Sequence, residues 1–282
     1  MDHQKNKIFY IGAAAAIAVL AIAAFMVLQK KGNETFSFVS SPNQMGTLQE
    51  SGSMKESASS DWWLDSGGIL NIGAQEFSTN KGSLPEDNKW RKLYNKNNPK
   101  DTDGGFFPQN IFRLVTKNKW QNLTQQVYFN IDKINLSQSE NRFEANGVLL
   151  FNRYLDGDNL YYTGLRVDGD AVIKKKVGGK YYTLKEAPFL TKKQKYDRVD
   201  NPDLIPTNAW IGLRSEVANI GNNTVYIKVY VDWEQKGDWQ LLLEAKDRGS
   251  EYGQAPFTQT GYAGIRTDFM DVKFKNYFIK ED

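Results

Sequence analysis

An uncharged stretch near the N-terminus constrains this chain more than any other feature does. From Ile8 to Leu28 there are 21 residues without a charged side chain, most of them Ala, Ile, Leu, Val or Phe. At 1.5 Å per residue, a helix of this length crosses the roughly 30 Å hydrocarbon core of a bilayer. The sequence therefore predicts a transmembrane anchor within residues 1–31 and a single-pass cell-membrane protein whose large C-terminal domain is extracytoplasmic.

A cleaved signal peptide is the alternative interpretation of this stretch. The apolar segment of a signal peptide usually has about 7 to 15 residues and ends in small residues at the cleavage site. Ala21, Ala23 and Ala24 would supply such a site, but the length of the stretch favours a retained helix. Four glycosylation sequons follow the predicted helix, at Asn33, Asn122, Asn135 and Asn222. They predict a glycoprotein, which is consistent with an external domain.

Residues 32–60 differ in composition from the chain on either side. They are rich in Gly, Ser, Asn, Gln and Thr and contain few large apolar side chains. Such a composition buries too little apolar surface to fold, so this segment is predicted to be a flexible stalk. The folded domain is then expected to span Asp61 to Asp282.

The folded part lacks the side chains that many enzymes require. The chain has no cysteine, and its only histidine, His3, lies before the predicted anchor. This inventory excludes Ser-His-Asp and Cys-His hydrolases, HExxH metalloproteases and His-ligated zinc sites. Only Asp, Glu, Lys, Arg and Tyr remain for catalysis.

The charge of the domain argues against a nucleic-acid partner. Of 36 basic and 33 acidic residues, four lysines and Asp2 lie in the first 31 positions, which leaves 32 of each sign. Binding to a phosphate backbone needs a clear basic surplus on one face. A neutral domain gives no such indication.

After Asp61 the sequence alternates between short apolar-periodic runs and turn residues, which is typical of a β-sandwich. Turn pairs such as Asp156-Gly157 and Gly178-Gly179 tolerate the positive φ that tight hairpins require. No segment with helical periodicity exceeds about two turns. Strands are predicted at 68–72, 110–116, 124–131, 147–153, 161–167, 171–177, 181–184, 209–217, 224–233, 239–246, 261–267 and 271–279.

Four segments resemble the concanavalin A-like lectin/glucanase superfamily: residues 146–184, NAWIGLRSEV, VYIKVYVDW and the closing GYAGIRTDFMDVKFKNYFI. The resemblance covers about residues 61–282. It implies an all-β fold of two stacked antiparallel sheets, the jelly-roll sandwich also found in laminin G-like modules. Lectins, glycosidases and polysaccharide lyases share this fold, so the resemblance alone assigns no function.

Paired aromatic residues are the first candidates for ligand binding. Neighbours on a strand face opposite sides, so one member of each pair should be exposed and able to stack on a sugar ring. Stabilisation of cross-strand neighbours is the alternative role. The predicted ligand contacts are Tyr161, Tyr162, Arg166, Tyr181, Tyr182 and Trp233; a further pair is Trp62-Trp63.

A basic stretch follows Asp170, with nine Lys or Arg residues against three acids up to Arg198. Interleaved with tyrosines, it would suit an acidic glycan. Lysines that protect an edge strand from association and lysines that attract anionic lipid are the alternatives.

Carboxylates give weaker signals. A glycosidase needs two acids about 5 to 10 Å apart in one cleft, and no pair here has a family-16 glucanase spacing. Arg214 and Glu216 resemble the Arg-x-Glu strand of jelly-roll alginate lyases and are the only catalytic candidates. The lyases' histidine-containing motif has no counterpart, because the domain has no histidine.

Oxygen ligands for a structural calcium ion occur in two places. Asp268 and Asp271, with Asn276 nearby, lie at the last predicted strand, and Asp101, Thr102 and Asp103 lie in a loop. Asp and Asn are also common in turns for backbone reasons, so both sites have an alternative explanation.

The sequence as a whole favours a membrane-anchored protein that binds a polysaccharide or glycan on a concave sheet. A polysaccharide lyase or glycosidase on the same fold is the alternative and predicts an acid, Tyr and Arg converging in the groove. A binding module predicts aromatics and amides there. A structural or adhesion protein of the cell envelope is the third possibility.

Overall fold

A computed structural model describes residues 36–38, 45–190 and 194–282. The predicted anchor, Ile8 to Leu28, lies outside these residues, as does the sequon at Asn33. Within the described ranges no helix combines the length and the apolar character needed to cross a bilayer. The anchor therefore stays a prediction.

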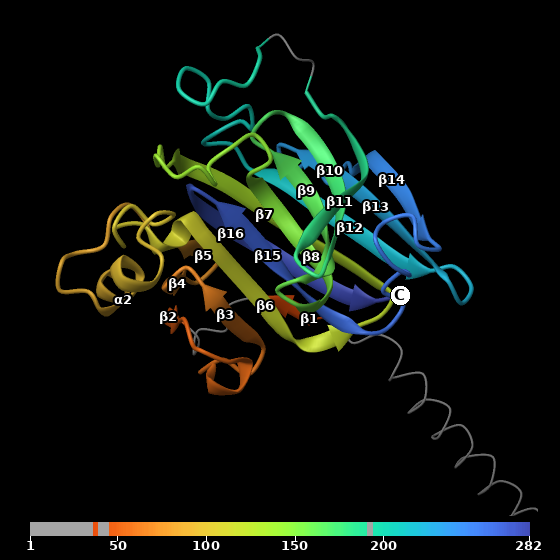
Figure 1. Ribbon diagram of the computed structural model, residues 1–282, viewed down its shortest axis with the longest axis horizontal. Coiled ribbons are helices and arrows are strands. Elements are labelled where there is room, and N and C mark those ends of the chain that lie inside the picture. Colours follow the sequence, from red (N-terminus) through yellow and green to blue (C-terminus); the bar gives the residue numbers. More distant parts are fainter. Residues whose placement is uncertain (1–35, 39–44, 191–193) are drawn as a thin grey trace, which may run out of the picture.

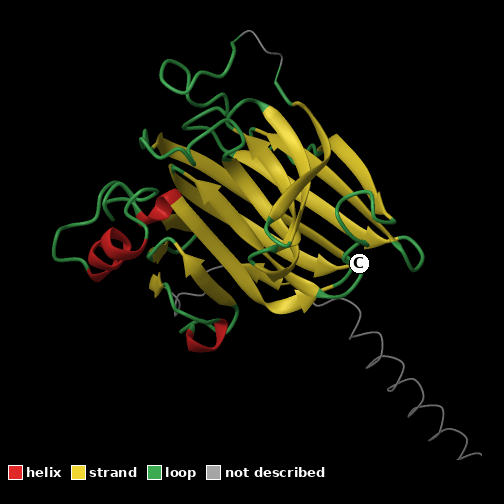
Figure 2. Ribbon diagram, in the orientation of Figure 1, coloured by secondary structure: helices red, strands yellow, loops and turns green. Residues whose placement is uncertain are grey.

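Two antiparallel sheets stack face to face, which confirms the predicted all-β, two-sheet sandwich (Figures 1 and 2). One sheet has nine strands, in the order β14-β13-β12-β7-β16-β5-β4-β2, with β1 also paired to β16. Their bounds are β1 Phe36–Phe38, β2 Gly46–Gln49, β4 Ile69–Ile72, β5 Glu76–Thr79, β7 Leu123–Ile134, β12 Ile211–Asn219, β13 Thr224–Trp233, β14 Gln240–Arg248 and β16 Met270–Glu281.

The other sheet has seven strands in the order β11-β10-β9-β8-β15-β6-β3. Their bounds are β3 Trp62–Ser66, β6 Ile111–Trp120, β8 Gly147–Asp156, β9 Asn159–Arg166, β10 Asp170–Val177, β11 Lys180–Pro188 and β15 Gly261–Asp268. The tight turns predicted at Asp156-Gly157 and Gly178-Gly179 connect β8 to β9 and β10 to β11. These hairpins place β8 to β11 side by side in chain order.

One α-helix, α2 (Lys89–Asn97), was not predicted. The side chain of Asn88 accepts a hydrogen bond of 2.8 Å from the backbone N–H of Trp90 and so caps the helix N-terminus. Trp90 and Tyr94 bury one face against Leu84. Two short 3₁₀ turns, η2 (Met54–Glu56) and η3 (Pro108–Asn110), complete the elements of the described residues.

The main core lies between the sheets and forms because apolar and polar residues alternate along the strands. Along β13 the side chains of Val225, Ile227 and Val229 are fully buried, while the intervening Tyr226 and Lys228 face outward. Because the side-chain period of a strand is two, this pattern fixes which face of the sheet meets its partner. Phe112, Leu114, Phe129, Leu213 and Ile265 belong to the same core.

The seven-stranded sheet is also apolar on its outer face. A second buried cluster there contains Val115, Leu149, Phe151, Tyr154, Leu160, Tyr162 and Val172. The ring of Tyr181 on β11 lies 5.9 Å from that of Tyr162 on β9, although β10 separates the two strands. The end of β11 that carries Tyr181 therefore curls over this face.

The stalk prediction needs correction where the structure describes the segment. β1 pairs with β16, β2 pairs with β4, and the side chain of Leu48 is buried in the core. Residue Glu50 accepts a hydrogen bond of 2.7 Å from the backbone of Gly68. Composition missed these strands because backbone pairing with an existing sheet requires few apolar side chains. The folded domain thus begins before Asp61.

A charged pair lies within the core and holds a connecting loop. The Lys175 and Asp247 side chains are fully buried, with the ammonium nitrogen 2.9 Å from a carboxylate oxygen. Lys175 also donates hydrogen bonds of 2.7 Å and 3.0 Å to the backbone oxygens of Gln254 and Ala255. The pair therefore holds the loop between β14 and β15 against the sandwich.

A buried carboxyl group should make the stability of the domain depend on pH. Burial raises the pKa of Asp203 from 3.8 to about 7. The folded state then binds the proton more tightly, so the contribution of Asp203 to the free energy of unfolding should fall by up to about 1.4 kcal/mol per pH unit as the pH rises from 4 to 7. Thermal unfolding measured across this pH range should depend less on pH in Asp203→Asn than in the parent protein. Asp200→Asn, which changes an exposed neighbour, is the control and should retain the pH dependence of the parent protein.

Candidate functional site

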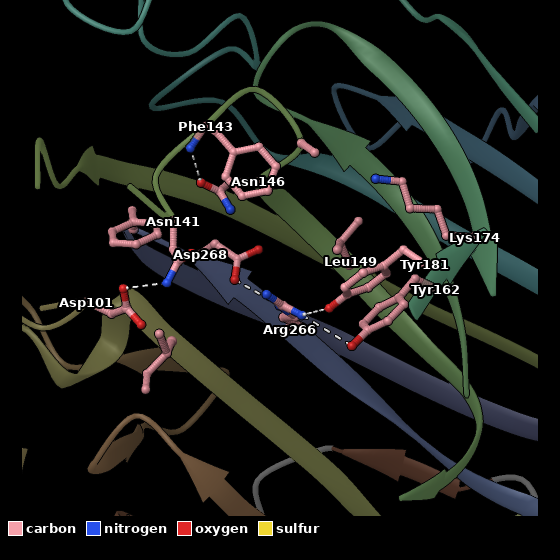
Figure 3. Close-up of a pocket in the computed structure, with 13 residues that line it drawn as sticks. Asp101, Asn141, Phe143, Asn146, Leu149, Tyr162, Lys174, Tyr181, Arg266 and Asp268 are labelled. Carbon is pink, nitrogen blue, oxygen red and sulfur yellow. Dashed lines mark hydrogen bonds and ion pairs between the residues drawn. The ribbon is translucent and has the colours of Figure 1, made fainter. Parts of the chain in front are cut away.

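A pocket of about 400 Å³ opens on the outer face of the seven-stranded sheet (Figure 3). Its floor comes from β8, β9 and β15, one side from β10 and β11, and the other from the loops 98–110 and 135–146. The volume lies in the range of small-ligand sites. The strands bring side chains that are distant in sequence to one place.

Arg266 lies at the centre of the pocket floor. Its Nε donates a 2.8 Å hydrogen bond to Asp268 Oδ1, because residues two apart on a strand share a face. Its Nη1 donates to the hydroxyls of Tyr162 and Tyr181 at 3.2 Å and 3.4 Å. Although burial lowers it, Asp268 and the two phenols raise the pKa of Arg266. The guanidinium is therefore a fixed, permanently charged donor.

The two tyrosines beside Arg266 have different environments. Tyr162 is 3% exposed, and burial raises its pKa. Tyr181 is 52% exposed; burial acts against it, but the charges of Arg266 and Lys176 lower its pKa. Tyr181 thus presents a free ring surface and an acidified hydroxyl to the pocket.

The loop wall supplies amides and a second carboxylate. Asp101 accepts hydrogen bonds from Ser139 and from the Asn141 amide at 2.9 Å, and these contacts lower its pKa although burial acts against them. The Asn146 oxygen accepts a 2.8 Å bond from the backbone of Phe143. The Phe143 side chain is 42% exposed. An aromatic ring and two amides thus border the opening.

Lys174 contributes the remaining charge. It lies on β10 directly opposite Tyr162 on β9, and Figure 3 shows it across the pocket from Asp101. In the part of the chain that the structure describes, its ammonium group has no hydrogen bond or ion pair. The pocket therefore has two carboxylates and two cations, with Asp101 and Lys174 at opposite sides.

Comparisons with known proteins give likenesses of fold. No family model matches the sequence, and no curated protein matches it either. Solved structures do match: a carbohydrate binding module, CBM66, from Bacillus subtilis has 13% identity and a TM-score of 0.46, covering 77% of this chain and 92% of its own.

A Bacillus subtilis protein of unknown function with a galectin-like fold has 9% identity and a TM-score of 0.44, covering 89% of this chain and 96% of its own. A Bacillus licheniformis beta-glucanase has 11% identity and a TM-score of 0.41, covering 79% and 92%. These proteins are jelly-roll sandwiches of the concanavalin A-like type. At these values the likeness concerns the fold alone, and the site must be judged from its own residues.

The structure separates the predicted aromatic contacts. Tyr162 and Tyr181 line the pocket, but Tyr161 is fully buried in the main core, where its hydroxyl bonds to Asp247. The expectation that one of Tyr161 and Tyr162 is exposed was wrong, since both faces of β9 are covered. The Tyr182 ring packs against Gly253, on the side of β11 away from the pocket. Trp233 stacks on Phe189 at 6.0 Å, outside the pocket.

Arg166 does not line the pocket either. It is nearly buried and forms ion pairs with Asp168 at 2.6 Å and Glu186 at 2.9 Å. These contacts join the end of β9 to β11. Arg166 therefore has a structural role beside the site.

The predicted catalytic pair lies on the other sheet. Arg214 and Glu216, on β12, belong to the outer face of the nine-stranded sheet. Arg214 donates to Gln126 at 2.6 Å and 3.1 Å, and Glu216 accepts from Tyr230 at 3.0 Å. They are not brought together with the pocket residues.

The predicted calcium ligands are engaged in hydrogen bonds. Asp268 pairs with Arg266, while Asp271 accepts bonds of 2.8 to 3.0 Å from Gly82, Gln109 and Asn135. Across the described residues no group of three or more His, Cys, Asp or Glu is placed to hold a metal ion. A calcium ion would compete with these bonds, and its binding stays a prediction.

Sequence reasoning did not single out Arg266, Asn141, Phe143 and Asn146. Arg266 and Asp268 stand two apart in β15, which already indicates a shared face. The loop residues carry no comparable signal, because their position depends on how the loops pack. Asp101 was singled out, but as a calcium ligand.

Proposed function

We propose that this chain binds a sugar unit of a polysaccharide or glycan in the pocket around Arg266. The observation that carries the proposal is the convergence of exposed rings with fixed polar groups. Phe143 and Tyr181 offer ring surfaces, while the amides of Asn141 and Asn146 and the guanidinium of Arg266 offer hydrogen-bonding groups. Sugars present apolar C–H faces together with hydroxyls, so this combination suits them.

A glycan array probed with the full chain in mild detergent, with and without calcium, tests this function and the calcium prediction. Specific binding supports the proposal, and loss of binding on calcium removal supports a structural ion. A blank array would shift the interpretation to a structural or adhesion role in the cell envelope.

Phe143→Ala should weaken glycan binding about tenfold, because the exposed ring is lost while the core is untouched. Leu136→Ala is the matched control, since Leu136 is 57% exposed on the same loop but does not line the pocket. Affinities on the best array ligand should separate the two variants. Equal affinity of Phe143→Ala and the parent protein would exclude stacking at this wall.

A second candidate function is elimination from an acidic polysaccharide. The specific observation is that an acid, a tyrosine and an arginine converge in the pocket, with the pKa of Tyr181 lowered. As the phenolate, Tyr181 is suited to take the proton next to a uronate carboxylate and, as the C–O bond to the leaving sugar breaks, to return that proton to the glycosidic oxygen. Absorbance of newly formed unsaturated ends distinguishes this reaction from binding, and Tyr181→Phe should abolish it.

We also propose that residues 8–28 form the predicted transmembrane helix and anchor the domain with the pocket facing away from the membrane. β1, which follows the predicted anchor, pairs with β16 near the end of that strand, at Phe36 and Ile279. The pocket residues Asp268 and Phe269 lie directly before the start of β16. At about 3.3 Å per residue, the ten residues from Phe269 to Ile279 separate the pocket from β1 by about 33 Å. Flotation of the full chain with liposomes, and its loss on deleting residues 1–31, tests the anchor.

A further inference from the structure

We propose that the sugar unit bound in the pocket carries an anionic group, a carboxylate or a sulfate ester, and that Lys174 binds it. This inference rests on the proposed glycan-binding function and specifies the class of ligand. The inference depends on which groups contact the four charged side chains of the pocket lining, which are Asp101, Asp268, Arg266 and Lys174.

The acidic groups of the pocket already have partners. Asp268 is balanced by Arg266, and Asp101 accepts hydrogen bonds from Ser139 and Asn141. Neither carboxylate contacts Lys174 in the described residues. The negative charges of the pocket are therefore already stabilised without it.

Lys174, in contrast, has no contacting acidic partner in the described residues. It is only partly exposed, and burial and the charge of Arg166 lower its pKa more than the charges of Glu186, Tyr181 and Asp168, none of which forms an ion pair with it in the described residues, raise it. A cation that has lost hydration without gaining a contacting carboxylate gains most from an anionic ligand. The Nη2 of Arg266, which has no hydrogen bond in the described residues, is a second donor for the same group.

The neighbouring lysines show that this lack of a partner is particular to Lys174. Lys175 points into the core and pairs with Asp247, and Lys176 pairs with Asp158 at 3.1 Å and donates to the backbone of Gly157. All three belong to β10, which lies between β9 and β11 and is not an edge strand. Protection of an edge therefore does not explain Lys174.

The separation of charges also orients the ligand. Lys174 and Asp101 lie on opposite sides of the pocket (Figure 3). An anionic group beside Asp101 would be repelled, while hydroxyl groups there can donate to its carboxylate. The anionic substituent is thus directed toward β10, and the hydroxyls toward the loop wall.

The test compares the affinities of the full chain for matched glycans that are neutral, uronate-bearing, sialylated or sulfated. Anionic glycans should bind at least tenfold more tightly than their carboxyl-reduced or desulfated forms. Lys174→Met should remove this preference. Lys185→Met, which removes an exposed lysine on β11, should retain the preference.

Equal binding of neutral and anionic forms would overturn the inference while supporting the proposed function. An unchanged preference in Lys174→Met would also overturn it. The absence of binding to every glycan would contradict both. A preference for carboxylates over sulfates, or the reverse, identifies which anionic group the pocket accepts.

Discussion

Replacing Lys175 by methionine should reduce the free energy of unfolding by about 3–5 kcal/mol. The substitution retains most of the side-chain volume but leaves the fully buried Asp247 carboxylate without its cation. It also removes the donors for the backbone oxygens of Gln254 and Ala255. Denaturant unfolding at neutral pH measures the loss.

The double variant Lys175→Met/Asp247→Leu should recover much of this stability, because the unpaired charge is then absent. Lys176→Met is the matched control, since its partner Asp158 is exposed and such pairs contribute about 1 kcal/mol or less. A loss below about 1 kcal/mol in Lys175→Met would contradict the buried pair.

Replacing Arg266 by methionine should weaken glycan binding at least about a hundredfold. A hydrogen bond to a charged group contributes about 1.5–3 kcal/mol, and two such bonds exceed the 2.7 kcal/mol that a hundredfold change requires. The change also leaves Asp268, which is 3% exposed, without its partner. Arg266→Lys should have an intermediate affinity, because it retains the charge but not the planar donor geometry. Titration calorimetry with the best array ligand measures both.

Arg113→Met is the control for this experiment. Arg113 lies on β6 directly opposite Arg266 on β15, on the same face but outside the pocket lining, and pairs with Asp65 at 3.2 Å. Its loss should leave glycan affinity within about threefold of the parent, since a change of 0.7 kcal/mol corresponds to that factor. Equal losses in both variants would indicate damage to the sheet and not a specific contact.

The alternation of apolar residues was sufficient to predict the sandwich and most strands of its centre. It failed for β1 and β2, because their pairing depends on the backbone and on strands far along the chain. It also missed α2, whose nine residues rely on an Asn88 cap and on burial of Trp90. Local sequence does not reveal contacts of this kind.

The site was predicted only in part, for a related reason. Period two correctly implies that Tyr161 and Tyr162 face opposite sides, but both are covered, Tyr161 by the other sheet and Tyr162 by neighbouring side chains that include the Tyr181 ring. The lysine run from Lys174 to Lys176 reads as uniform charge, yet Lys175 pairs with Asp247 and Lys176 with Asp158, while Lys174 lines the pocket with no contacting carboxylate among the described residues. The period of two predicts the face of the sheet on which each side chain lies, but the contacts that the side chain makes there depend on the tertiary fold.

Hydrogen exchange of the full chain with and without its best glycan ligand is the most direct test of the central claim. Glycan binding should slow exchange in β9, in β11 and in residues 141–146, which surround the pocket. Protection confined to β12 and β13, around Arg214 and Glu216, would place the ligand on the opposite sheet and contradict the account.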